Sequence, residues 1–258
     1  LMAGSGALAL AAQRSTEPAP AERTGPAGRG IWRSGTLQVL TLLMLLMGGI
    51  FGALEVSTVA FAEESGAIWA TGWLLGIFAL ASGLTGLYLG ARPGGWPLST
   101  QIVAGTATLA VATSVIPFIN GPVWYAAGMF AAGLGVSAVM IGAMQLIERS
   151  LPRARLTEAL ALAISGVLVG SAAAVALAGA LIDVGDSSTG LAVGSVAALA
   201  GLAVAIAARP SLIRVEAVEP QDLDLAEGSP AGHAGSASLT NAPAGPPALS
   251  GDGTAPPG

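Results

Sequence analysis

The chain has 258 residues, of which 53% are hydrophobic and 10% charged, and its formal net charge is −5 at pH 7. Soluble domains carry about 25% charged residues, so this composition excludes an ordinary soluble enzyme. There is no cysteine and one histidine, His233, which excludes cysteine-ligated metal sites and nearly all histidine-based catalysis. We therefore expect no enzymatic activity, no metal and no cofactor. The ten basic residues form no basic surface for nucleic acid.

The chain begins with two short segments that do not span a membrane. Residues 1–12 are apolar but too short, and residues 13–36 have the composition of a polar linker. Residues 1–12 are either a signal peptide or the end of a truncated transmembrane helix. We favour the truncated helix, because no positively charged segment precedes the apolar stretch and the sequence does not begin with Met. On this interpretation the sequence is the C-terminal part of a longer protein.

Residues 37–208 predict an all-α integral membrane protein, a bundle of six transmembrane helices. A helix needs ~20 apolar residues to cross the hydrocarbon core. The stretches that provide this length are residues 37–62, 68–90, 98–119, 123–147, 159–182 and, slightly short, 191–208. Short connections rich in Gly, Pro, Asn and Asp separate them, so consecutive helices are expected to be antiparallel neighbours.

The arginines predict the orientation of the bundle. All ten lie in segments on one side of the predicted spans, namely residues 13–36, the loop at Arg92, residues 148–158 and the segment after residue 208. The loops on the other side contain none. Since arginine-rich loops remain in the cytoplasm, we expect a multi-pass protein of the cell membrane with both ends cytoplasmic. The final segment, residues 209–258, is rich in Pro, Gly, Ala and Ser and is predicted to be a disordered cytoplasmic tail.

Glu55 is the one ionisable residue within the six predicted spans. A carboxylate at this depth costs several kcal/mol unless it is protonated, paired or hydrated, so it is a candidate proton or substrate site. Helical spacing places it on a small and polar stripe with Thr41, Gly48, Gly52 and Thr58, so we expect it to point into the bundle or a cavity. The alternative is that Glu55 lies near the outer surface and is merely solvated.

Two aromatic residues, Trp124 and Tyr125, open the fourth span. Together with Thr41 and Thr58 they are candidates for lining a cavity and stacking on an apolar substrate. The alternative for the aromatic pair is an anchor at the lipid headgroups.

Glycine pairs four residues apart recur, and we interpret them as sites where helix backbones approach closely. They are Gly48/Gly52, Gly72/Gly76, Gly86/Gly90, Gly166/Gly170 and Gly190/Gly194.

Three local motifs are informative: residues 48–56 (GGIFGALEV), 83–94 (GLTGLYLGARPG) and 148–155 (ERSLPRAR) with the following TEA. They resemble the second half of a major facilitator superfamily transporter, in particular bacterial drug-efflux-like members. The first motif is similar to the first helix of that half, the second to the family's Gly-rich loop and the third to its penultimate loop. Ala91 stands where the family's Gly-rich motif has Asp. The resemblance implies half of a twelve-helix fold whose partner is a missing N-terminal six-helix half.

The resemblance also implies a function and a gate. The function is secondary active transport of a small-molecule substrate by alternating access, with proton-coupled export as the expected mode. In the family, loop arginines brace the cytoplasmic gate, and here these are Arg92, Arg149 and Arg153. Their alternative role is to fix topology and contact anionic lipid.

Other membrane functions are weighed against transport. Intramembrane proteolysis requires histidine or metal ligands that the predicted spans lack. A six-helix membrane subunit of an ATP-driven permease, or a non-transporting scaffold, remains an alternative. An ATP-binding partner would then have to be a separate chain, because this sequence has no lysine and therefore no phosphate-binding Gly-Lys-Ser/Thr loop.

The predicted orientation can be tested with accessibility tags at residues 64 and 92. We expect opposite faces of the membrane for the two tags, because a single span separates them. Labelling of both from the same side would contradict the six-helix arrangement.

Overall fold

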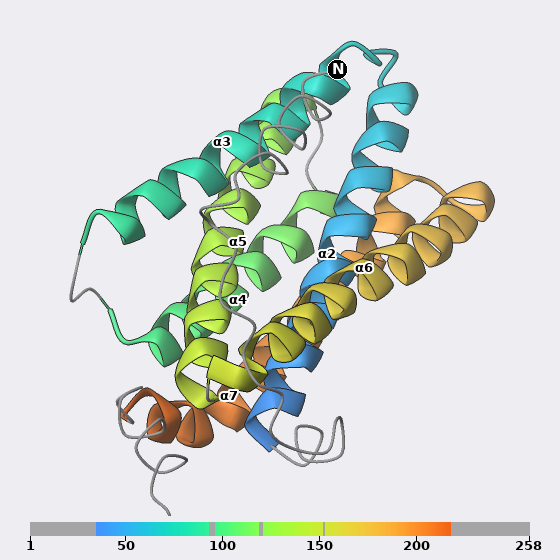
Figure 1. Cartoon of the computed structure of the whole chain (residues 1–258). Coiled ribbons are helices and arrows are strands. Elements are labelled where there is room, and N and C mark those ends of the chain that lie inside the picture. Colours follow the sequence, from blue (N-terminus) through green and yellow to red (C-terminus); the bar gives the residue numbers. More distant parts are fainter. Residues whose placement is uncertain (1–34, 93–95, 119–120, 152, 218–258) are drawn as a thin grey trace, which may run out of the picture.

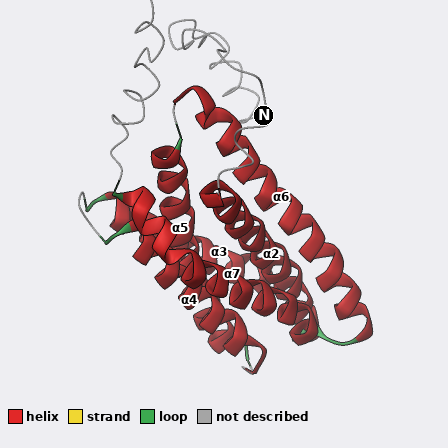
Figure 2. Cartoon of the chain, turned by 90° about the horizontal axis from the view of Figure 1, so that it is seen from below, coloured by secondary structure: helices red, strands yellow, loops and turns green. Residues whose placement is uncertain are grey.

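The computed structural model describes residues 35–92, 96–118, 121–151 and 153–217. The predicted truncated helix at residues 1–12, nearly all of the linker and tail residues 218–258 lie outside the described residues. The described part consists of helices and connecting loops and contains no strand (Figure 2). The predicted all-α class is confirmed.

Six long helices form the described part of the chain, and each is long and apolar enough to cross a membrane. In chain order they are α2 (Gly35–Glu64), α3 (Ala70–Gly90), α4 (Leu98–Val115), which continues into the short 3₁₀ helix η3 (Ile116–Phe118), α5 (Pro122–Ser150), α6 (Arg153–Val184) and α7 (Ser187–Glu216). All six predicted spans correspond to one helix each.

The helix boundaries follow from local sequence chemistry. Gly121 has a φ of 98°, a left-handed conformation that favours glycine, and Pro122 occupies the first turn of α5, where its missing N–H costs nothing. Asp186 caps α7. Its carboxylate accepts a hydrogen bond from the Thr189 amide at 3.0 Å, and its own amide donates to the Thr189 hydroxyl at 3.3 Å.

The helices extend beyond the predicted spans. Residues 209–216 were assigned to the tail by sequence but form the last turns of α7. The physical reason is visible at two side chains: Leu212 is fully buried, and Glu216 forms hydrogen bonds with the start of α4. Hydropathy locates the part of a helix that lies in lipid, whereas these last turns are held by contacts at the end of the bundle.

The packing of the helices has an internal repeat. α2 packs mainly on α6 and α7, α5 packs mainly on α3 and α4, and α4 and α7 pack on each other. Exchanging the first three helices with the last three preserves these pairings. Because consecutive helices alternate in direction, the two sets run in opposite senses. The bundle is therefore built as two inverted sets of three helices.

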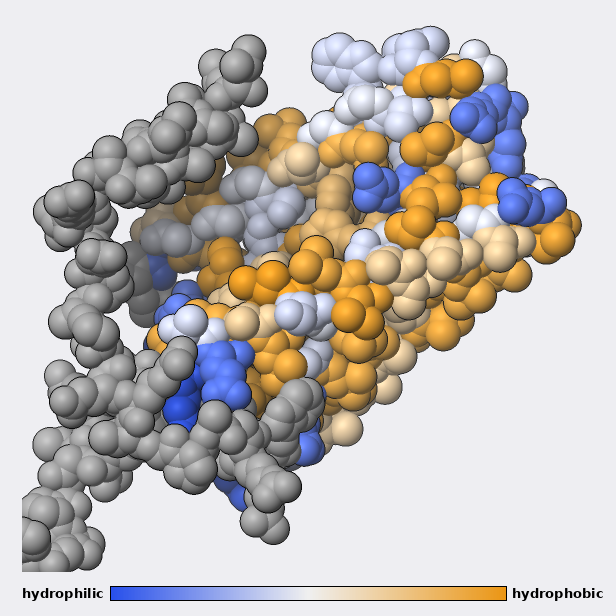
Figure 3. All heavy atoms as spheres, turned by 45° about the vertical axis from the view of Figure 1, so that its right-hand side comes forward, coloured by the Kyte–Doolittle hydropathy of each residue, from blue (hydrophilic) through white to orange (hydrophobic). Residues whose placement is uncertain are grey.

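One pairing breaks the repeat. α6 packs on α7, whereas the corresponding helices α3 and α4 barely approach each other. Figure 1 shows α3 diverging from the start of α4 on one side of the bundle. On the face seen in Figure 3, apolar side chains cover the middle of the molecule and hydrophilic ones gather mostly towards its two ends.

α2 and α6 cross at a contact made of glycines. A Cβ atom at Gly48 would overlap the carbonyl of Val167, and one at Gly170 would overlap the carbonyl of Leu45. A Cβ at Gly52 would overlap the Ser171 carbonyl, and one at Gly166 would lie 3.2 Å from the Thr41 carbonyl oxygen. These two glycine pairs act as packing sites, as expected. By contrast, Gly72 and Gly76 of α3 have no atom within 4 Å of the position a Cβ would take.

We predict that Gly48→Ala destabilises the fold by about 1–3 kcal/mol, the usual cost of overpacking. Gly76→Ala is the matched control on an open helix face. It should leave stability unchanged or raise it by up to ~1 kcal/mol through helix propensity. Reversible unfolding of the purified protein in mixed detergent micelles measures both changes. Equal stability of the two variants would show that the α2–α6 crossing is not close.

Candidate functional site

Glu55 is exposed on α2. Its side chain therefore does not point into the interior of the six-helix bundle, which was one of the two expected directions; the other, a cavity outside these six helices, stays a prediction. The residue lies nine positions before the end of α2 at Glu64, roughly 13 Å along the helix axis. The small and polar face of α2 predicted from helical spacing contacts two different helices. Gly48 and Gly52 face α6, whereas Thr58 faces α5. Glu55 lies outside both contacts.

Thr41 packs at the α2–α6 crossing. Its methyl group lies 3.6 Å from where a Cβ of Gly166 would be. Its hydroxyl oxygen is buried without a hydrogen-bond partner. Its surroundings are a helix–helix contact, and it lines neither of the two grooves described below.

Thr58 and Tyr125 are brought together, as members of one buried cluster. The Thr58 hydroxyl donates to the Leu54 carbonyl at 2.6 Å and lies 3.2 Å from the Tyr125 hydroxyl. The Tyr125 ring stacks on Phe61 with centroids 4.0 Å apart and planes inclined by 10°. This cluster joins α2 to α5. Neither Thr58 nor Tyr125 lines the two grooves described below, so their predicted contact with substrate gains no support from these positions.

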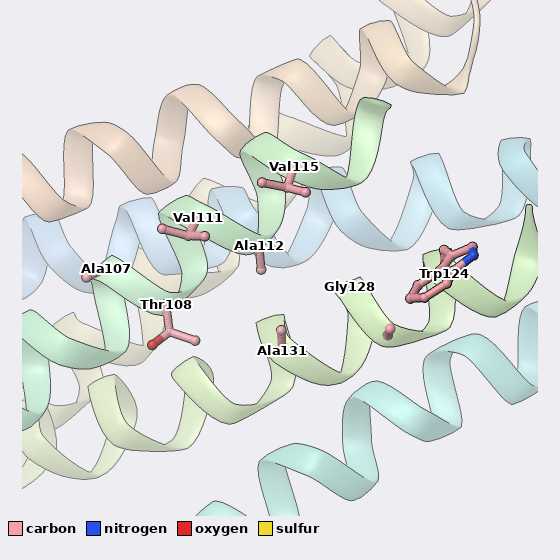
Figure 4. Close-up of a pocket in the computed structure, with 9 residues that line it drawn as sticks. Ala107, Thr108, Val111, Ala112, Val115, Trp124, Gly128 and Ala131 are labelled. Carbon is pink, nitrogen blue, oxygen red and sulfur yellow. The ribbon is translucent and has the colours of Figure 1, made fainter. Parts of the chain in front are cut away.

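Trp124 lies in a shallow apolar groove between α4 and α5 with a volume of about 540 Å³ (Figure 4). The indole is 67% exposed. Val111 and Val115 of α4 line the opposite wall. Thr108 contributes the polar group of the groove, but its hydroxyl already donates to the Ala104 carbonyl at 2.9 Å. The groove can hold an apolar chain and has no charged side chain in its wall.

A second, more polar cleft lies among α3, α4 and α5 and reaches the end of α7; its volume is about 660 Å³. Two of the predicted gate residues, Arg92 and Arg149, line it. The Arg92 guanidinium lies 4.7 Å from the centre of the Tyr88 ring, an attractive cation–π contact. Arg149 donates a hydrogen bond to the Glu216 carbonyl at 3.5 Å. Arg153 begins α6, but its side chain lies outside what the structure describes.

Gln101 contributes a buried amide to this cleft. Its side chain is 8% exposed. The amide nitrogen donates to the Trp96 carbonyl at 2.7 Å, while the amide oxygen Oε1 is buried without a partner. Buried polar atoms are nearly always paired. Oε1 of Gln101 is therefore an unsatisfied acceptor beside the cleft, and because the atom itself is buried, a molecule in the cleft would reach it only after the side chain turned.

Glu216 closes the cleft on the side of α7 and caps α4. Its carboxylate accepts hydrogen bonds from the Leu98 amide at 2.5 Å, the Ser99 amide at 3.3 Å and the Ser99 hydroxyl at 3.0 Å. A carboxylate at a helix N-terminus satisfies free N–H groups and is favoured by the helix dipole. The negative charge of Glu216 is thus committed to the fold.

Glu64 has the same role at the opposite end of the bundle. It accepts hydrogen bonds from the Ser187 amide at 2.7 Å and the Ser187 hydroxyl at 2.6 Å, which caps α7. The neighbouring cap residue Asp186 is exposed. Hydrogen bonds from the Ser188 hydroxyl and the Thr189 amide hold the pKa of Asp186 below its usual value, so it remains ionised at neutral pH.

Sequence reasoning missed Gln101, Glu64 and Glu216. Ser99 and Ser187 at helix starts signal that a cap is needed. The carboxylates that supply the caps lie 117 and 123 residues away, and no local pattern connects them. Among the described residues, no three His, Cys, Asp or Glu side chains lie together as a metal would require.

Comparison of the chain with models of known protein families gives no match, and a search among curated proteins gives none.

We predict that Glu64→Ala destabilises the protein by about 1 kcal/mol, the usual value of a helix cap. Glu63→Ala is the matched control, because it removes the same charge from the adjacent exposed position. Hydrogen exchange should quicken at the first amides of α7 in Glu64→Ala only. The same rate in both variants would contradict the capping role.

Proposed function

We propose that this chain is one six-helix unit of a secondary active transporter of the major facilitator type, which moves a small molecule across the cell membrane by alternating access. The observation that carries the proposal is the exposed carboxylate of Glu55 on an apolar helix. An uncompensated charge facing lipid costs several kcal/mol. We infer that a second protein unit, or an aqueous cavity between two units, covers this face.

The unburied faces of α3 and α6 support the same inference. Within the most apolar stretch of each helix, the buried share is 17% in α3 and 22% in α6, whereas it is 56% in α2. Four glycines of α3 have open space where a Cβ would lie, and they recur along the helix at Gly72, Gly76, Gly83 and Gly90. Small residues let helices approach closely in lipid. A second six-helix unit is the proposed partner of these faces.

The inverted arrangement of two three-helix sets also supports the proposal. Transporters of this type contain such inverted sets within each half, and alternating access arises when one half rocks against the other. Here α2 and α5 hold equivalent places in the two sets and are joined through Thr58 and Tyr125. The unit would therefore move as a rigid body.

In the proposed mechanism Glu55 takes up a proton from one side of the membrane and releases it to the other as the two units rock. We propose apolar or cationic small molecules as substrates, exported against the proton flow. The orientation proposed from the arginines places Glu55 nearer the outer end of α2 and the polar cleft at the cytoplasmic end.

The first test is the gene sequence upstream of Leu1 in the same reading frame. The proposal predicts six further spans with a Gly-rich loop bearing Asp and Arg after the second. A start codon immediately before Leu1 would contradict the half-transporter arrangement.

The second test measures proton-coupled flux of a cationic dye, ethidium, in everted vesicles containing this chain and the upstream unit. Glu55→Gln should abolish dye accumulation driven by the proton gradient while leaving membrane insertion intact. Glu63→Gln is the control, because it removes the same charge from the end of α2. Unchanged flux across pH in Glu55→Gln would reject the coupling role. Flux that requires ATP and survives collapse of the proton gradient would favour the permease-subunit alternative.

A further inference from the structure

The polar cleft exists because the two helix sets differ at one place. On the side of α6 and α7 the three helices α2, α6 and α7 close on one another. On the equivalent side α3 is held to α5 by the Ser137 hydroxyl, which donates to the Ser82 carbonyl at 2.6 Å, but it stands apart from α4. The cleft of about 660 Å³ therefore occupies a position that helix packing fills in the other set.

The charge at the mouth of this cleft is positive. Arg92 and Arg149 both line it. Arg92 contacts a tyrosine ring, and Arg149 donates to a backbone carbonyl, its one hydrogen bond among the described residues. Glu216, the carboxylate in the wall, is committed to the amides and hydroxyl at the start of α4. The two guanidinium groups thus retain donors for an anion.

The interior of the cleft has two kinds of wall. Gln101 lines the interior, and its Oε1 is buried behind this lining without a hydrogen-bond donor, so a turn of the side chain would expose an acceptor to the cleft. Further into the bundle the lining is apolar and includes Leu134, Ala138 and Ile141 of α5. A fitting occupant therefore has an anionic group, a hydroxyl or other donor close to it, and an apolar chain.

We propose that this cleft binds an anionic phospholipid with a hydroxylated headgroup, such as phosphatidylglycerol. The phosphate would lie at Arg92 and Arg149, and one acyl chain would fill the space between α3 and α4. A headgroup hydroxyl would donate to Gln101 Oε1 once this side chain turned toward the cleft. The apolar walls favour a lipid over a free anion. The bound lipid takes the place of the missing α3–α4 contact. This inference is independent of the transport proposal.

The test is native mass spectrometry of the full chain in detergent, titrated with phosphatidylglycerol or with phosphatidylcholine of the same acyl chains. We expect phosphatidylglycerol to bind the more tightly of the two. The double variant Arg92→Gln/Arg149→Gln should weaken phosphatidylglycerol binding about tenfold, as expected for loss of charge-assisted hydrogen bonds. Arg214→Gln is the control, because Arg214 is exposed at the same end of the bundle and does not line the cleft.

A second variant isolates the buried amide. Gln101→Leu keeps a side chain of similar size and removes the acceptor. It should therefore weaken the binding of phosphatidylglycerol. Binding of phosphatidylmethanol, whose phosphate carries a methyl group in place of glycerol and so has no headgroup hydroxyl, should be unaffected. Circular dichroism shows whether each variant folds. If the double variant does not fold, the single variants Arg92→Gln and Arg149→Gln are titrated in its place.

Three results would overturn the proposal. One is equal affinity for the two lipids, and another is an equal loss in Arg214→Gln, which would indicate attraction to general positive charge. The third is displacement of the lipid by inorganic phosphate at similar concentration, which would identify a free-anion site. Loss of phosphatidylglycerol preference in the cleft variants alone supports the lipid site.

Discussion

In lipid, every backbone N–H and C=O group has to be satisfied within the protein, and apolar side chains alone supply no drive for helices to associate. The six-helix bundle meets both demands with few polar atoms. Glu64 and Glu216 cap the first amides of α7 and α4 from other helices. Because these caps connect segments far apart in the chain, they also fix how the helix ends meet. The glycines at the α2–α6 crossing meet the second demand by letting the two backbones touch.

The sequence was sufficient to predict the helical class, the six spans and the loops between them, since all of these depend on local hydropathy and on residues such as Gly121, Pro122 and Asp186. It also located Gly48 and Gly170 as packing positions. The direction of Glu55 could not be obtained in this way. Helical spacing groups residues on a face, but it does not tell which neighbour that face meets, and here α6 covers Gly52 while Glu55 remains exposed.

The candidate site was predictable only in part for a related reason. The sequence indicated the loop arginines as candidate site residues because of their charge, and two of them, Arg92 and Arg149, line one cleft. Gln101 is an unremarkable polar residue in the sequence. Its unpartnered Oε1 and its place in the cleft are visible only in the three-dimensional structure, where α3 and α4 diverge. A property that depends on the absence of one helix–helix contact has no signature in either helix alone.

The exposed side chains of the bundle are of two kinds. Around the groove of α4 and α5 they are large and apolar, as at Val111, Val115 and Trp124, a composition suited to acyl chains. On α3 exposed glycines alternate with large apolar side chains such as Trp73 and Leu87, so this helix is also suited to lipid. Glu55 on α2 differs from these residues, because a carboxylate is costly in lipid. The exposed carboxylate, and not the composition of a whole helix face, is therefore the feature that a purely apolar environment does not explain.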